Sequence, residues 1–338
     1  MSDIIFSPTR RVDTTQRHLE KRRANKGDGI PMYLGNVDMV KGGRGKFVPA
    51  QRGEMTSIIA RPANGKTGYM IRWAREHAKW LRKNKKTDSV VVYVTREAAV
   101  ENLQTFLLAA EARDQELLKK STTEIIMGDI SDTEWDDLMQ INADSVASPL
   151  WIIGHSLARE ASRPPLTIEN ITMALKEIEE WGNEKKSQYI DLVFFDYLQK
   201  FPIPTGMDMR AAMIQYMDAF KDMAIEFNCH SIVGVQAKRE VETRKYPIPL
   251  LNDGMETANI EQASQNVFSL VRPIMYFQEG DNFGDKDSVV VEKDQLLLTC
   301  LKQTNGEPNW SKWLSFAPEY NRLSMLEMQS IDLKEYAP

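Results

Sequence analysis

The part of the sequence best suited to bind phosphate is residues 57–74, SIIARPANGKTGYMIRWA. Its pattern predicts a short apolar strand at 57–60, a Gly-containing turn that ends in Lys66 and Thr67, and a helix from Gly68 onward. In a phosphate-binding loop of pattern G-x-x-x-x-G-K-[ST], backbone N–H groups and the helix N-terminus surround the β-phosphate. The lysine neutralises the β and γ oxygens, and the hydroxyl holds Mg²⁺. The predicted nucleotide-binding residues are therefore Arg61, Pro62, Ala63, Asn64, Gly65, Lys66, Thr67 and Gly68.

The match to this pattern is imperfect, because Ala60 stands at the first position in place of glycine. Alanine is the smallest replacement, and it fits unless that position requires a positive φ or a very close backbone approach. The tripeptide Gly-Lys-Thr alone is weak evidence, so the surrounding elements must support the assignment.

Polar side chains also follow three apolar runs at the points where strands are expected to end. Glu97 follows VVVYVT, Asp196 ends the apolar run within YIDLVFFDYLQ, and Gln236 ends SIVGVQ. Ligands of open α/β sheets gather at the carboxyl ends of parallel strands. Asp196 there would hold Mg²⁺ through water, Glu97 would orient or deprotonate an attacking water, and Gln236 would hydrogen-bond a γ-phosphate. The alternative for each is an ordinary strand-end residue: a turn aspartate, a solvated glutamate at a helix start, and a capping amide.

Apolar β-branched runs and helical patterns alternate along the chain after residue 56. Strands are expected at 57–60, 89–94, 151–154, 189–196 and 231–236, with later strands at 267–277 and 295–302. Helices are expected from 68, at 98–119, after Pro164 and Pro165, and at 213–227. This order predicts an α/β fold with a mainly parallel central sheet covered by helices.

Length and composition fit one large α/β domain with an extension. The chain has 338 residues, of which 42% are hydrophobic, and its formal net charge of −5 argues against a basic coat for nucleic acid. Cys229 and Cys300 lie in apolar runs without C-x-x-C spacing, so buried free thiols are expected instead of a disulfide or a zinc site. No apolar run approaches the ~18 residues of a membrane span, and a cytoplasmic protein without membrane contact is expected.

The first ~50 residues differ in character from the rest. They combine a polar, basic helix candidate, TTQRHLEKRRANKGDG, with a Gly-rich basic loop, VKGGRGKFVPAQRG. The expected organisation is an arm and linker at 1–50, an α/β nucleotide-binding core at 51–330 and a tail at 331–338.

Taken in order, six motifs resemble those of the DnaB-like replicative helicases, which have a RecA-like P-loop NTPase core. The motifs are GEMTSIIARPANGKT, VVYVTREAAVENL, LVFFDYLQ, IVGVQAKRE, METANIEQASQNVFSLVRP and LLLTCLKQTNG. The resemblance extends from about residue 29 to residue 323, and DYLQ after an apolar strand, with IEQA further on, is more specific than the phosphate loop.

The resemblance implies Lys66 and Thr67 as phosphate and Mg²⁺ ligands, Glu97 as the catalytic carboxylate, Asp196 as the second metal-side acid and Gln236 as the γ-phosphate sensor. It also implies a ring of six subunits with ATP between neighbours, and an N-terminal helix that docks on the adjacent subunit. The arm's alternative is a disordered basic tail that touches nucleic acid directly.

The segment after Gln236, AKREVETRKYPIP, would then be a pore loop that meets single-stranded DNA. Its candidate phosphate contacts are Lys238, Arg239, Arg244 and Lys245. The alternative is a solvated mobile loop in which Glu240 and Glu242 balance these cations.

Two further departures from the family bear on mechanism. In LKQTNG the family pattern is K-x-R-x-G, whose arginine reaches the neighbour's γ-phosphate, whereas this chain has Lys302 and then Thr304. An arginine finger contributes ~10³ to 10⁵ in rate, so slow hydrolysis is expected unless Lys302 or another cation substitutes. In addition, only ~50 residues precede the core, where such helicases carry a separate domain; a compact phage or mobile-element helicase is expected.

The leading expectation is therefore a Mg-ATP-dependent, ring-forming helicase or translocase that acts on single-stranded DNA in replication. Its expected partners are DNA, copies of itself in a hexamer, and replication or loader proteins. The alternative is an ATP-gated DNA-binding or recruitment protein of the same fold with weak or no unwinding. A RecA-like ATPase that acts on protein partners is a third possibility.

Overall fold

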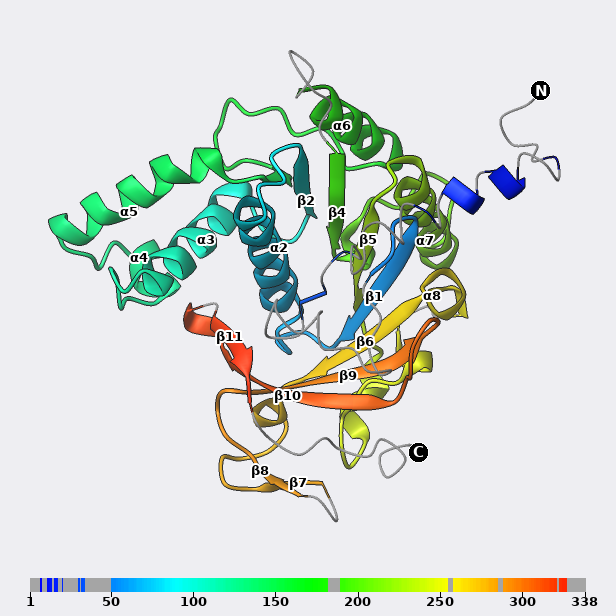
Figure 1. Ribbon diagram of the computed structural model, residues 1–338. Coiled ribbons are helices and arrows are strands. Elements are labelled where there is room, and N and C mark those ends of the chain that lie inside the picture. Colours follow the sequence, from blue (N-terminus) through cyan, green and yellow to red (C-terminus); the bar gives the residue numbers. More distant parts are fainter. Residues whose placement is uncertain are drawn as a thin grey trace.

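The described residues of the computed structural model are 7, 11–13, 15–17, 20, 30, 32–33, 50–181, 189–254, 258–284, 288–320 and 322–326. They contain a nine-stranded sheet in the order β11-β10-β9-β6-β1-β5-β4-β2-β3 and a two-stranded hairpin, β7-β8 (Figure 1). The strands of the large sheet are β1 (Glu54–Ala60), β2 (Ser89–Thr95), β3 (Leu150–Ile153), β4 (Tyr189–Asp196), β5 (His230–Gln236), β6 (Asn266–Val271), β9 (Gln295–Gln303), β10 (Trp310–Ala317) and β11 (Arg322–Met325). The hairpin is β7 (Asn282–Phe283) and β8 (Val289–Val290).

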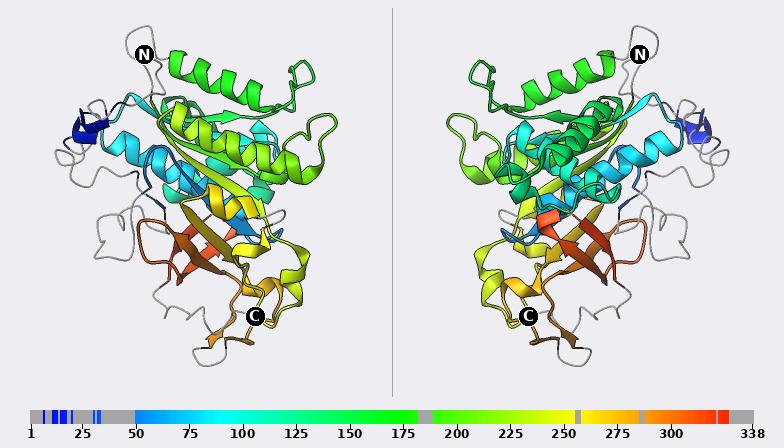
Figure 2. Two further views of the ribbon diagram at one scale, coloured as in Figure 1. Left: turned by 90° about the vertical axis from the view of Figure 1, so that its right-hand side faces the viewer. Right: turned by 90° about the vertical axis from the view of Figure 1, so that its left-hand side faces the viewer.

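Helices cover both faces of the sheet (Figures 1 and 2). The described helices are α2 (Lys66–Lys83), α3 (Val100–Asp114), α4 (Thr122–Ile126), α5 (Asp132–Asp144), α6 (Ile168–Trp181), α7 (Met209–Glu226) and α8 (Ala258–Ala263), of which α4 and α5 pack on α3 instead of on the sheet. One core cluster joins the sheet to α6 and α7, and a second joins the opposite face to α2. The predicted α/β architecture is confirmed.

The central strands are parallel, as the alternation of strands and helices predicts. β1 pairs with β5 and β6, β4 pairs with β5 and β2, and β2 pairs with β3, all in parallel. Every residue of β2 is buried, and in β4 all but the first are buried, because helices cover both faces. The carboxyl ends of these strands therefore lie at one edge of the sheet.

The C-terminal side of the sheet differs from the prediction. The strand expected at 267–277 ends at Val271, because Pro273, which has no N–H to donate to a ladder, begins a short 3-10 helix, Pro273–Met275. β9 pairs antiparallel with β6 and β10, and β10 with β11. β10 and β11 had no counterpart among the predicted strands.

Two helix boundaries also differ. The helix expected at 98–119 ends at Asp114, and α4 and α5 follow, each begun by a serine in a capping box, Ser121 and Ser131. The helix expected at 213–227 begins four residues earlier, at Met209, because the Asp208 side chain caps it by accepting from Ala211 N at 2.7 Å.

Parts of the N-terminal segment belong to the core. Ile30, Met32, Tyr33 and Ala50 are at most 4% exposed, and Ile30 pairs with Ala50 in an antiparallel bridge. In the proposed arm helix, residues 11–13, 15–17 and 20 are helical, and Gln16 donates to Glu20 at 2.8 Å. The rest of the arm and the tail at 331–338 lie outside the described residues.

Both cysteines are buried free thiols, as expected, and burial raises the pKa of each to about 12. In the described ranges, no helix combines the length and apolarity that a membrane crossing requires.

Candidate nucleotide site

The loop between β1 and α2 has the backbone geometry of a phosphate cradle. Gly65 precedes α2 with φ of 82°, and Ala63 has φ of 62°. A Cβ on Gly65 would lie 2.9 Å from a ring carbon of Phe316, so both conformation and space favour glycine there. Ala60, by contrast, is a strand residue paired with Gln236 and Leu270. The alanine at this position therefore meets no requirement for a positive φ.

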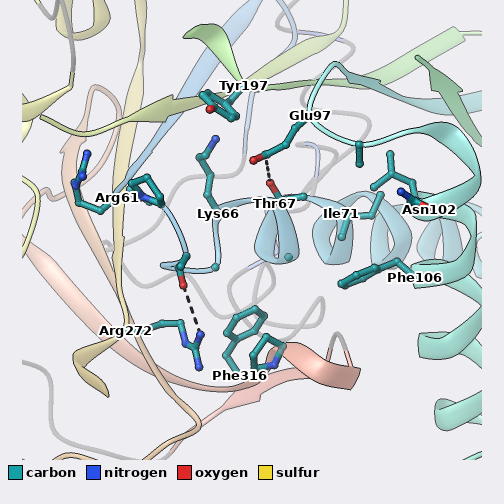
Figure 3. Close-up of a pocket in the computed structure, with 18 of the residues that line it drawn as sticks. Arg61, Lys66, Thr67, Ile71, Glu97, Asn102, Phe106, Tyr197, Arg272 and Phe316 are labelled. Carbon is teal, nitrogen blue, oxygen red and sulfur yellow. Dashed lines mark hydrogen bonds between the residues drawn. The ribbon is translucent and has the colours of Figure 1, made fainter. Parts of the chain in front are cut away.

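Four predicted residues converge beside this loop, and Figure 3 shows three of them, Lys66, Thr67 and Glu97. Lys66 Nζ lies 3.5 Å from Asp196 Oδ1, and Thr67 Oγ1 donates to Glu97 Oε2 at 3.0 Å. Asp196 is fully buried and accepts from Tyr93 Oη at 2.8 Å. β1, β2 and β4 deliver these groups to one edge of the sheet, as the parallel order predicts.

The charge of Lys66 is balanced by its surroundings. Burial lowers the pKa of this ammonium, while Asp196 and Glu97 oppose that effect. The Lys66 ammonium also lies 3.4 Å from the ring centre of Tyr197, a cation–π contact. The ammonium of Lys66 is thus held at the mouth of the loop by the Asp196 carboxylate and the Tyr197 ring.

A cavity of about 610 Å³ opens over these residues. Nucleotide-sized ligands occupy pockets of about 300–1,000 Å³. One end is polar, formed by the phosphate loop, Glu97, Tyr197 and Gln236; the other is mainly apolar, lined by Ile71, Leu103, Phe106, Ile126, Phe316 and Pro318. The cavity therefore suits a ligand with an anionic end and a flat, less polar end.

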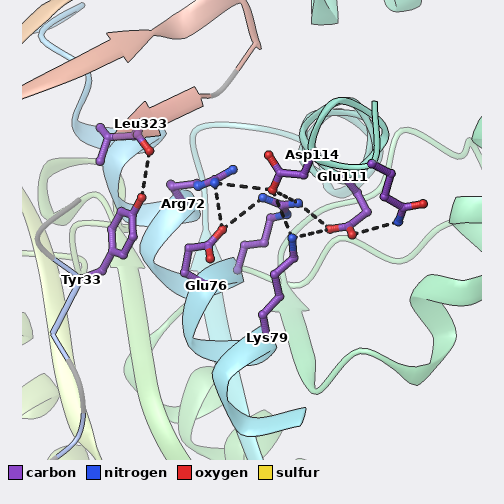
Figure 4. A network of polar contacts seen from close by, with 9 residues as sticks. Tyr33, Arg72, Glu76, Lys79, Glu111, Asp114 and Leu323 are labelled. Carbon is purple, nitrogen blue, oxygen red and sulfur yellow. Dashed lines mark hydrogen bonds and ion pairs between the residues drawn. The ribbon is translucent and has the colours of Figure 1, made fainter. Parts of the chain in front are cut away.

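Ion pairs between α2 and α3 fix the apolar wall (Figure 4). Arg75 Nη2 lies 2.5 Å from Glu111 and 2.8 Å from Asp114, and Lys79 Nζ lies 3.1 Å from Asp114. Although partial burial alone would raise the pKa of Glu111, the hydrogen bond from Gln115 and the cations Arg75 and Lys79 lower it to about 2. Since α3 carries Leu103 and Phe106, this network positions that side of the cavity.

Several lining residues were not predicted, among them Arg272 and Phe316. The guanidinium of Arg272 lies 5.5 Å from the ring centre of Phe316, and its backbone N–H donates to Asn64 Oδ1 at 2.8 Å. Arg272 directly follows β6, so the strand-end rule that identified Glu97 would also have found it. Phe316 lies on the unpredicted β10, and no local sequence signal indicates its role.

Asn64 differs from the other predicted loop residues. It is 1% exposed and does not line the cavity. Its side chain holds the loop in place by donating to Tyr276 Oη at 2.8 Å and by accepting from Arg272 N. Gln236 does line the cavity, and its backbone N–H donates to Gln199 Oε1 at 3.0 Å.

Lys302 lies away from the cavity of its own subunit. It is near the end of β9, where Nζ donates to the carbonyl of Glu261, and Thr304 Oγ1 donates to Gln265 O at 3.0 Å. Asn305 contacts Glu54, at the start of β1. Lys302 pairs with Val267, which pairs with Ser57 of β1, and Lys302 is not among the residues that line the cavity.

The predicted pore loop is ordered by polar contacts. A 3-10 helix spans Arg239–Thr243, and Arg244 makes a two-point ion pair with Asp253 at 2.5 and 2.7 Å. Lys238 Nζ donates to Asn252 O at 3.2 Å, whereas Arg239 and Lys245 are exposed. Arg244 is therefore engaged within the protein, while two of the four predicted cations face solvent.

A strand, phosphate loop and helix, with acids at the ends of two neighbouring parallel strands, define an α/β P-loop NTPase core of RecA-like type. The chain belongs to the DnaB-like helicase C terminal domain family, whose family model matches residues 29–324.

Similar proteins support this assignment. "Replicative DNA helicase DnaC" of Bacillus subtilis (strain 168) is 24% identical over 322 residues, which is 94% of this chain and 62% of that protein. "Probable replicative DNA helicase" of Trieres chinensis is 27% identical over 274 residues, 80% of this chain and 53% of that protein. The chain thus spans about half to three-fifths of the length of these relatives.

Solved structures share the fold. An ATPase domain aligns with a TM-score of 0.72 and 19% identity over 94% of this chain and 99% of its own. A DnaB-like replicative helicase, described together with its interactions with primase, aligns with a TM-score of 0.69 and 19% identity over 93% of this chain and 67% of its own.

Proposed function

We propose that the chain binds ATP in this cavity, hydrolyses it at the boundary between subunits of a ring, and uses the energy to move along single-stranded DNA as a replicative helicase. The observation that carries the proposal is the convergence of Lys66, Thr67 and Glu97 at the polar end of the cavity, with the buried Asp196 directly behind Lys66. Family membership supports the same activity.

The chain's own groups would act as follows. Backbone N–H groups of the loop and the Lys66 ammonium bind the β and γ phosphate oxygens. Glu97 accepts the proton of an attacking water and orients it toward the γ-phosphorus, and the Gln236 amide contacts the γ-phosphate. The apolar end of the cavity, with Phe316 and Arg272, receives the base.

The oxygen donors at the site fit Mg²⁺. Within the described residues no cluster of three or more His, Cys, Asp or Glu could hold a metal by itself, so phosphate oxygens and water would complete the ligand set. Thr67 Oγ1 and Asp196 would hold Mg²⁺, which neutralises charge on the β and γ oxygens when bound.

Lys302 supports action between subunits. Its ammonium donates to Glu261 O and it does not line the cavity of its own chain, but a ring would bring it to a neighbour's cavity. In this proposal Lys302 replaces the arginine that the family places two residues later, where this chain has Thr304.

The proposal is tested by measuring ATP hydrolysis with and without oligo-dT, together with displacement of a labelled strand from a forked duplex. The wild-type chain should show DNA-stimulated hydrolysis and strand displacement. Glu97→Gln should bind an ATP analogue with nearly wild-type affinity and lower turnover by about 10²-fold or more. Wild-type protein without DNA stimulation and without strand displacement would exclude the helicase function.

Thr304 favours a second candidate, an ATP-gated DNA-binding protein that unwinds little. The two are separated by Thr304→Arg and Lys302→Ala. A rise in turnover in the first variant indicates a weakened motor. ATP-dependent assembly on DNA that survives Lys302→Ala, with no strand displacement in any variant, indicates the switch.

A further inference from the structure

The segment between Ala237 and Gly254, called here the 237–254 segment, is closed on itself. Ala237 and Gly254 form an antiparallel bridge at its base, and Lys238 N donates to Asp253 O at 2.6 Å. The Asp253 side chain is buried and joins the base to the middle, because it pairs with Arg244 and accepts from Leu250 N at 2.6 Å. These contacts favour motion of the segment as one unit.

One side chain of the phosphate loop holds this segment at two points. Arg61 follows β1 directly and lines the nucleotide cavity. Its Nη1 donates to Ala237 O at 2.9 Å, and its Nε donates to Glu242 Oε1 at 2.7 Å. The Arg61 side chain is 11% exposed, so this ion pair is partly shielded from water. In Figure 3 Arg61 and Lys66 extend to the same side of the loop.

A bound triphosphate would compete with Glu242 for this guanidinium. An arginine has five N–H donors in a fixed planar fork and pairs strongly with phosphate oxygens. Anionic phosphate beside Arg61 therefore changes the free energy of the Arg61–Glu242 contact. A ligand shifts a second site only through such a difference in interaction between two states.

We infer that the Arg61–Glu242 ion pair couples nucleotide occupancy to DNA binding by the 237–254 segment. The inference rests on the proposed function, since it assumes that the cavity binds ATP and that the segment meets single-stranded DNA. Both residues act by positioning: Glu242 fixes the segment relative to the phosphate loop. Because coupling is reciprocal, DNA on the segment must change nucleotide affinity by the same factor.

Glu242→Gln tests this with a matched control. The variant keeps the shape of the side chain and removes its charge. Glu240→Gln removes the same charge from the same segment, but the contact described for Glu240 is its main-chain carbonyl, which accepts from Thr243 Oγ1 at 2.8 Å. Both variants lower the negative charge near DNA equally, so general electrostatics should raise DNA affinity in both.

The measurement is the dissociation constant of fluorescent oligo-dT for the full chain, with and without a non-hydrolysable ATP analogue, at one salt concentration. For the wild type, the ratio of the dissociation constants without and with the analogue should differ from one. Couplings of about 5- to 150-fold are typical. Glu242→Gln should bring the ratio to within about twofold of one, whereas Glu240→Gln should keep the wild-type ratio. The analogue's dissociation constant, measured with and without oligo-dT, should change in parallel.

Three results would overturn the inference: a wild-type ratio of one, a wild-type ratio retained by Glu242→Gln, or an equal loss in Glu240→Gln. Failure of the proposed function is distinct, because wild-type protein would then bind neither the analogue nor oligo-dT. Circular dichroism spectra and melting curves check that both variants fold.

Discussion

Single residues of the phosphate loop differ in the backbone conformation that they require. Ala60 is a strand residue, whereas Ala63 has φ of 62°, a region that costs an L-residue roughly 1 kcal/mol or more. Substitution by glycine should therefore destabilise the protein at position 60 but not at position 63.

Ala60→Gly should lower the free energy of unfolding by about 0.5–1 kcal/mol, because glycine loses more backbone entropy in a strand. Ala63→Gly should leave it unchanged or raise it by up to about 1 kcal/mol, because relief of the left-handed strain offsets the entropy cost. Denaturant unfolding of the nucleotide-free protein measures both. Destabilisation by Ala63→Gly as large as that by Ala60→Gly would contradict the loop geometry.

For single residues, the sequence predicted the location of those site residues that stand at or just after the end of a strand. Glu97, Asp196 and Gln236 were predictable because a parallel sheet places strand ends together. The side chain of Asn64 donates to Tyr276, a partner 212 residues away that the local sequence does not indicate. The pairing of Arg244 with Asp253 depends on how the intervening turn folds, which residue types alone do not specify.

At the scale of secondary-structure elements, the last residue of β5 donates its backbone N–H to a side chain instead of to a neighbouring strand. β4 pairs with β5 only as far as Phe195 and Val233, so Gln236 extends beyond the paired part of β4. The Gln199 side chain supplies the missing acceptor, at 3.0 Å from Gln236 N. This contact holds the strand end that carries Gln236, the proposed γ-phosphate sensor.

Gln199→Met should remove this acceptor while keeping the size of the side chain. The amide hydrogen of Gln236 should then exchange with solvent about tenfold faster or more, since a lost hydrogen bond is worth about 1 kcal/mol or more at a buried site. Gln199→Glu keeps an acceptor oxygen and should preserve the protection. Mass-spectrometric hydrogen exchange of the peptide covering β5 measures the effect, and unchanged protection in Gln199→Met would rule out the clamp.

A buried histidine at the start of β5, His230, should make the free energy of unfolding depend on pH. His230 Nδ1 lies 2.8 Å from Gln51 O and Nε2 lies 2.8 Å from Thr56 Oγ1, which is the pattern of a neutral ring protonated at Nδ1. Burial lowers the pKa of His230 from 6.5 to about 4. The unfolded chain therefore binds this proton from about pH 6.5 downward, before the folded chain does.

The free energy of unfolding should fall as the pH is lowered from about 6.5 to 4, by up to roughly 3 kcal/mol from this residue. His230→Gln should be less stable at pH 8 and should show a shallower slope over this range. Urea unfolding at several pH values measures both. Equal slopes for the two proteins would exclude His230 as the cause.

The strands of the sheet differ in how well the sequence predicts them. The buried parallel strands have long apolar runs, so their order was predictable from alternation with helices. β10 alternates buried and half-buried residues and follows a turn, and β11 is four residues long, so neither stands out from loop sequence. Phe316, which bounds the cavity, was missed for that reason.

At the scale of the whole molecule, the position of Lys302 outside the lining of its own cavity predicts that hydrolysis depends on neighbouring subunits. Glu97→Gln damages the cavity, and Lys302→Ala damages the group offered to the next subunit. Each variant alone should hydrolyse ATP slowly. In a random equimolar mixture about a quarter of the interfaces combine an intact Glu97 with an intact Lys302, so activity should return to about that fraction of wild type.

Steady-state hydrolysis after mixing and reassembly measures this recovery. The control is a mixture of Glu97→Gln with Lys66→Ala, whose defects lie in the same cavity and cannot complement each other across an interface. Equal activity in the two mixtures would contradict catalysis between subunits.

The most direct test of the central claim is electron cryomicroscopy of the full chain with Mg²⁺, a non-hydrolysable ATP analogue and oligo-dT. The account predicts density for the triphosphate against Lys66 and Thr67, with Glu97 and Asp196 beside it and Lys302 supplied by the adjacent subunit. Nucleotide bound elsewhere, or a cavity without nucleotide in particles that carry DNA, would contradict it.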